Sequence, residues 1–71
     1  MTIEELKNEI EEMLQKYEND FPKFHNVENI SRADLESTEV LLEALEKEGN
    51  LQNYIVTGNE KKILDNCCIN Y

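Results

Sequence analysis

The chain has 71 residues, a length that fits one small domain, and its 16 acidic and 7 basic side chains give a net charge of −9. This balance argues against direct binding to a nucleic-acid backbone or an anionic membrane surface, since both need clustered Lys and Arg. A chain this short buries only about 60% of the surface that its unfolded form exposes. We therefore expect residues 1–71 to form a single acidic domain of marginal stability.

Several features predict a cytoplasmic protein. No apolar run approaches the roughly eighteen residues of a membrane span, and residues 1–12 lack the basic and apolar regions of a signal peptide. Cys67 and Cys68 are adjacent, so they do not form a disulfide framework. The richness in Asn, Ile, Lys and Glu is typical of an AT-rich coding sequence, which is a faint indication of a bacterial or viral source.

The first predicted helix covers residues 2–18. Thr2 and Glu5 have the spacing of a capping box, in which each side chain bonds the backbone N–H of the other residue. Pro22 disfavours helical geometry at the residue before it, so the helix should end before the proline. Five apolar side chains recur three and four positions apart, as in a seam that packs against another helix: Ile3, Leu6, Ile10, Met13 and Tyr17.

Residues 21–30 form a neutral connection with an apolar side chain at every third position: Phe21, Phe24, Val27 and Ile30. This spacing is more typical of short turns folded over a core than of a solvated linker. We therefore expect an ordered connection between two helices.

The second predicted helix covers residues 32–48. Ser31 is a natural N-cap with Asp34 three residues later, and Gly49 is the expected C-terminal stop. Apolar side chains cover about 200° of the helix surface at about 100° per residue, namely Val40, Leu41, Leu42, Ala44 and Leu45. So wide an arc needs covering from more than one side, by residues 51–71 or by a second copy of the chain.

The last third of the chain permits two interpretations. Apolar residues in 50–56 and 63–71 recur at helical spacing, which predicts one or two short helices, the first stopped by Gly58. The alternative is a β-hairpin at about 53–64, because Gly58-Asn59 is an accepted two-residue turn and the preceding residues have strong β-propensity. Residues 61–64 do not alternate between polar and apolar, which favours the helical interpretation.

The predicted fold class is accordingly all-α. We expect a small helical bundle built on an antiparallel two-helix hairpin, with one or two short C-terminal helices. An α+β fold with a C-terminal hairpin is the alternative.

Residue types that support catalysis or metal binding are scarce. Cys67, Cys68 and His25 are the only soft ligands, and they lack the spaced pairs that structural zinc requires. The cysteines are better explained as small apolar residues, and His25 as a turn residue. Nothing pairs a nucleophile with a base. We therefore predict no enzymatic activity, no metal site and no cofactor.

The acidic side chains of the second helix form a regular row, at spacings of 3, 4 and 3 residues: Glu36, Glu39, Glu43 and Glu46. At about 1.5 Å per residue the row is about 15 Å long, and one strand of B-DNA passes four or five phosphates in that length. This face can therefore imitate the charge density of a nucleic-acid strand. A second, partly matching row lies on the first helix: Glu5, Glu9 and Glu12. The competing interpretation is a solvated surface that only keeps the chain soluble.

The acidic rows favour a small regulatory or inhibitory protein that docks on a basic surface of a partner protein. Small phage-encoded inhibitors have this general profile, which is an analogy only. One alternative is an oligomerisation or scaffold module in which the 3–17 seam pairs between two chains of a homodimer. Another is a precursor peptide whose working part is the Cys-containing tail at residues 65–71, with the acidic helices as its recognition leader.

Overall fold

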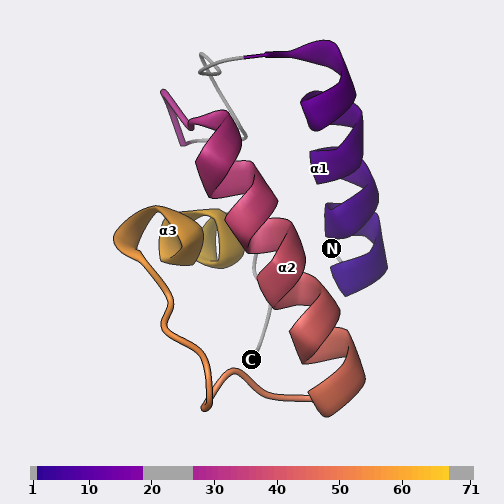
Figure 1. Cartoon of the computed structure of the whole chain (residues 1–71), viewed down its shortest axis with the longest axis vertical. Coiled ribbons are helices and arrows are strands. Elements are labelled where there is room, and N and C mark those ends of the chain that lie inside the picture. The colour runs from indigo at the N-terminus through magenta and orange to yellow at the C-terminus, as the bar shows by residue number, and fades with distance from the viewer. Residues whose placement is uncertain (1, 19–26, 68–71) are drawn as a thin grey trace.

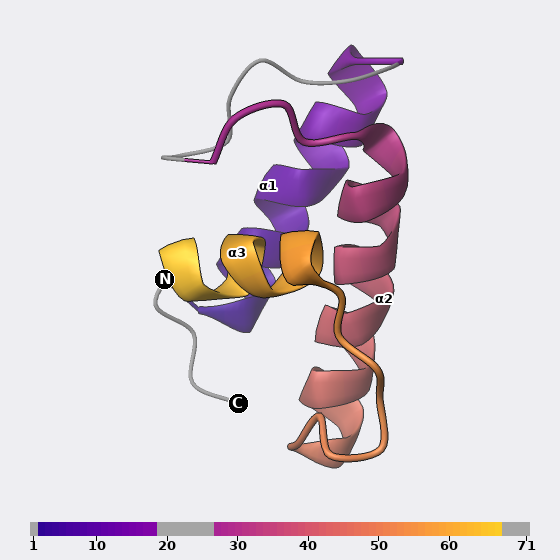
Figure 2. The ribbon, with the colours of Figure 1, turned by 90° about the vertical axis from the view of Figure 1, so that its left-hand side faces the viewer.

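A computed structural model describes residues 2–18 and 27–67 of the chain. These residues form three α-helices: α1 (Ile3–Lys16), α2 (Arg32–Glu48) and α3 (Gly58–Asn66). The first two helices run antiparallel and side by side, and α3 lies crosswise and packs against α2 (Figure 1, Figure 2). The predicted all-α fold and its antiparallel hairpin are confirmed. The described residues contain no strand, so the alternative hairpin at about 53–64 is wrong.

Local capping fixes the ends of the first two helices largely as the sequence predicts. Thr2 Oγ1 accepts a hydrogen bond from the Glu5 N–H at 3.1 Å, but Glu5 Oε1 accepts from the Thr2 hydroxyl and so completes no capping box. At α2 the box is complete, because Ser31 Oγ accepts from the Asp34 N–H and Asp34 Oδ2 accepts from the Ser31 N–H. Gly49 ends α2 with a φ of +80°, a conformation that glycine adopts without strain.

The start of α3 differs from the prediction. Residues 50–57 form a non-helical connection, and Gly58 begins a helix instead of stopping one. The physical reason is a capping box: Thr57 Oγ1 accepts from the Glu60 N–H at 3.2 Å, and Glu60 Oε1 accepts from the Thr57 N–H at 2.7 Å. The side-chain amide of Asn59 also donates to Asp34 Oδ2 at 2.9 Å, which joins the start of α3 to the start of α2.

One core holds the three helices together, and it contains Leu6, Ile10, Ile30, Leu35, Leu41, Leu42, Leu45, Leu51, Ile63, Leu64 and Cys67. Residues of the predicted seam of α1 therefore pack inside the chain, while Tyr17 at its end is 42% exposed. Of the predicted connection, residues 27–30 lie in the described part of the chain. Ile30 there is buried, and Asn29 turns the chain with a φ of +57°.

The buried arc of α2 is shifted from the predicted one. Val40, expected in the core, is 62% exposed, whereas Thr38 is completely buried. Val40 is two positions from the buried Leu42, so about 200° separates the two around the helix axis. The Thr38 hydroxyl donates to the Asp34 carbonyl at 2.8 Å, which satisfies it inside the core.

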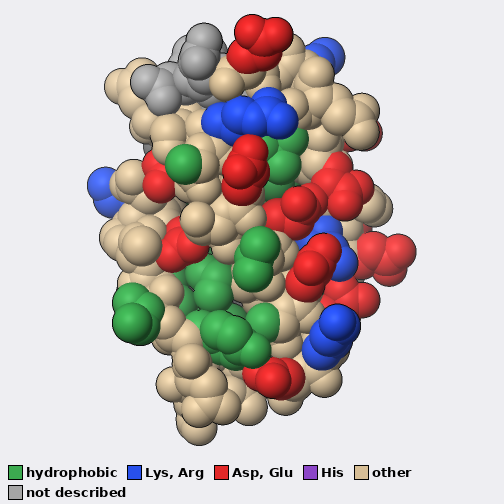
Figure 3. All heavy atoms as spheres, in the orientation of Figure 1, with side chains coloured by type: hydrophobic (Ala, Val, Ile, Leu, Met, Phe, Trp, Pro, Cys, Tyr) green, Lys and Arg blue, Asp and Glu red, His purple; other side chains and the backbone are tan. Residues whose placement is uncertain are grey.

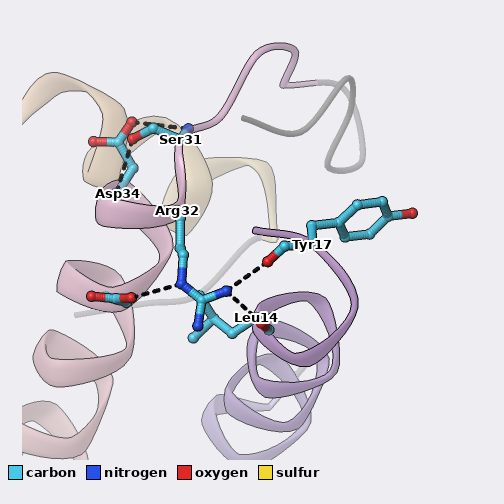
Figure 4. A network of polar contacts seen from close by, with 6 residues as sticks. Leu14, Tyr17, Ser31, Arg32 and Asp34 are labelled. Carbon is cyan, nitrogen blue, oxygen red and sulfur yellow. Dashed lines mark hydrogen bonds and ion pairs between the residues drawn. The ribbon is translucent and has the colours of Figure 1, made fainter. Parts of the chain in front are cut away.

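A single arginine joins the end of α1 to the start of α2 (Figure 4). Arg32 Nη1 donates to the carbonyls of Leu14 and Tyr17, both at 2.6 Å, and Arg32 Nε donates to Glu36 Oε1 at 3.1 Å. The last carbonyls of a helix lack partners within the helix, and a cation there also complements the helix dipole. Arg32 therefore caps α1 from the neighbouring helix.

The Glu60 capping box predicts a difference between two variants. Glu60→Ala should lower the free energy of unfolding by about 1 kcal/mol, the usual cost of losing a cap. Glu60→Gln should cost less, because its amide oxygen can still accept the Thr57 N–H. Urea unfolding followed by circular dichroism measures both, and equal losses would show that the negative charge of Glu60 at the start of α3, not the hydrogen bond of the cap, is what matters.

The arginine cap predicts that Arg32→Met lowers the free energy of unfolding by about 1–2 kcal/mol, the range for hydrogen bonds from a charged donor on a partly exposed side chain. Glu36→Gln is the matched control, since it removes only the exposed ion pair and should cost less than about 0.5 kcal/mol. Thermal unfolding of both variants compares them. Because Arg32→Met removes the ion pair together with the carbonyl contacts, a loss for Glu36→Gln as large as that for Arg32→Met would mean that the carbonyl contacts contribute little.

Candidate functional site

The predicted acidic row of α2 lies beside α1. Glu46 Oε2 forms an ion pair with Lys7 Nζ on α1 at 3.2 Å, and Glu43 and Lys7 line the same open hollow of about 420 Å³. The hydrogen bond to Glu46 raises the pKa of Lys7 above its usual value. Acidic side chains gather on this part of the surface (Figure 3).

Glu39 has the most unusual environment in the row. Its side chain is half-buried, and its Oε2 atom is buried with no hydrogen-bond partner among the described residues. Burial raises the pKa of Glu39 above its ordinary value of 4.5, and the charges of Glu11 and Glu43 raise it further. Lys7 acts in the opposite direction. Two carboxyl groups therefore meet across the α1–α2 interface.

The glutamate that α1 contributes to this region is Glu11, not a member of the predicted second row. Glu9 is two positions from Glu11, so about 200° separates them around the α1 axis. Glu9 and Glu12 line a different hollow, of about 450 Å³, beside Met13. Glu5 is exposed and bonded to Thr2. The structure thus leaves the two predicted rows on separate faces.

We name the α2 row together with Glu11 the acidic seam: Glu11, Glu36, Glu39, Glu43 and Glu46. Its two ends are neutralised in part, by Arg32 at Glu36 and by Lys7 at Glu46. The remaining carboxyl groups, those of Glu11, Glu39 and Glu43, lie near one another, since Glu11 and Glu43 both raise the pKa of Glu39. The arrangement suits attraction of a cationic group from another molecule.

The remaining candidate residues are placed as follows. Cys67 is 6% exposed and belongs to the core at the end of α3, whereas His25 and Cys68 lie outside the described residues. Residues 2–18 and 27–67 hold no group of three or more His, Cys, Asp and Glu side chains that could hold a metal ion. None of the helices in these ranges combines the length and apolar character needed to cross a bilayer.

Comparisons with protein-family models, with curated proteins and with solved structures found no match to this chain.

The raised pKa of Glu39 predicts a pH-dependent effect of Glu39→Gln. Ionised Glu39 costs folding free energy, so this cost is absent below pH 4.5 and enters as the pH rises through the higher pKa of the folded chain. The variant should therefore melt at a higher temperature than the wild type at pH 7, and the gain should vanish below pH 4.5.

Thermal unfolding across this pH range provides the measurement, with Glu12→Gln as a control at an exposed glutamate of α1. If Glu39→Gln raises the melting temperature equally at both ends of the range, the gain does not come from the titration of Glu39.

Proposed function

We propose that the acidic seam docks on a basic surface of a partner protein, and that the chain acts as a small regulator or inhibitor in the cytoplasm. The observation that carries the proposal is Glu39, whose buried Oε2 has no hydrogen-bond partner among the described residues. Ionisation of such a group opposes folding. A lysine or arginine of a partner would compensate this charge and convert an unfavourable contact into a favourable one.

The shape of the row supports a partner surface with regularly spaced cations. One flank of α2 carries four carboxylates over about 15 Å: Glu36, Glu39, Glu43 and Glu46. The spacing between these charges is within a factor of two of the phosphate spacing along a nucleic-acid strand. A protein surface that normally holds nucleic acid is the partner class that fits this charge pattern. The second row, Glu5, Glu9 and Glu12, lies on the other flank of α1 and would assist by long-range attraction.

Charge reversal tests this proposal. The partner is first identified by affinity capture from the native host and mass spectrometry, and its affinity is then measured by calorimetry at increasing salt. Glu43→Lys with Glu46→Lys should weaken binding by at least about 100-fold, since like charges then face each other across the contact.

The matched control is Glu9→Lys with Glu12→Lys, which makes the same change in net charge on the other flank of α1. It should weaken binding much less, while circular dichroism shows both variants folded. The proposal fails if binding survives reversal of the α2 row, or if added salt leaves the affinity unchanged.

A further inference from the structure

A second surface lies next to the acidic seam, and it is apolar. We name it the apolar patch: Val40, Ala44 and Tyr54, which line one open hollow. Val40 is 62% exposed, while Ala44 and Tyr54 are half-buried. Hydrophobic side chains gather between α2 and the connection that follows it, beside the acidic side chains (Figure 3).

The 50–57 connection holds its part of the patch in place. The Tyr54 hydroxyl donates to Glu48 Oε2 at 2.6 Å, and the Tyr54 N–H donates to the carbonyl of Leu51, a core residue. Tyr54 also packs against the core, so its side chain is held both by this packing and by the hydroxyl contact.

The apolar patch and the acidic seam are continuous. Val40, Ala44 and Tyr54 line an open hollow of about 270 Å³, and Glu43 and Lys47 line both this hollow and the neighbouring one. One partner segment lying along α2 would therefore contact both surfaces at once.

We propose that the apolar patch binds an apolar side chain that is flanked by Lys or Arg on the partner protein. This inference rests on the proposed function of the acidic seam and specifies the chemistry of the partner. Two carboxylates, Glu43 and Glu48, and one cation, Lys47, line the hollow, so its charge stays negative and cations beside the apolar group would complement it. A second copy of the chain is the poorer occupant, since each copy has a net charge of −9 and a two-fold contact would face these carboxylates with themselves.

Two synthetic peptides of equal length and charge test the inference, one an amphipathic Leu–Lys sequence and the other a Ser–Lys sequence. Calorimetry on the wild type should give the Leu–Lys peptide a Kd at least about tenfold lower, because burial of even one aliphatic side chain is enough for this ratio. Val40→Ser should remove this preference and leave the Kd of the Ser–Lys peptide unchanged.

The Val40 side chain is exposed, so the variant should fold, and circular dichroism checks this. The matched control is Ser37→Asn, which alters an exposed polar residue of α2 outside the hollow and should keep the preference. A preference that survives in the Val40 variant overturns the inference. So does a dimer that light scattering detects in the wild type and not in this variant, since a second copy would then cover the patch.

The test separates the two proposals. Glu43→Lys with Glu46→Lys should weaken binding of both peptides, whereas Val40→Ser should change only the difference between their Kd values. If the charge variant binds both peptides as the wild type does, the acidic seam is not a docking surface, whatever the preference shows.

Discussion

The arrangement of the chain depends on the contact between Arg32 and the end of α1. Its guanidinium donates to two carbonyls that the helix itself leaves unpaired. The same residue begins α2, so one side chain joins the end of the first helix to the start of the second. Lys7 and Glu46 pair near the other end of the two antiparallel helices, so the flank of α2 that carries Glu46 faces α1. The acidic seam lies along this flank, between the two contacts.

The acidic seam also shows how stability and charge oppose each other in a small protein. A domain of this size has little stability to lose, yet it places Glu39 against Glu11 where ionisation is unfavourable. Hydrophobic packing of α1 and α2 outweighs this cost, since Leu6, Ile10, Leu35 and Leu42 are completely buried between the helices and the rest of the core. Under the proposed function, a cation of the partner would offset this cost in the complex.

Features that depend on neighbouring residues in the chain could be predicted from the sequence, and features that depend on tertiary packing could not. Ser31 and Gly49 mark the ends of α2 through local hydrogen bonds and backbone geometry. The Thr57–Glu60 capping box is the same kind of local signal, but Gly58 taken alone is equally typical of a helix stop. The flank of α1 that faces α2 is set by packing, so periodicity alone groups Glu5, Glu9 and Glu12 with the α2 row, whereas Glu11 is the residue that lies there. Periodicity also places Val40 in the core, because the expected arc is wider than the buried one.

Asp34 has a role in cooperativity that follows from its contacts. One of its carboxylate oxygens accepts from the Ser31 N–H and from the Asn59 side chain, and its carbonyl accepts from Thr38. Opening of the first turn of α2 would therefore also break this tie to the first turn of α3, although 25 residues separate Asp34 and Asn59. In hydrogen-exchange terms, we expect the amides at the two helix starts to lose part of their protection together.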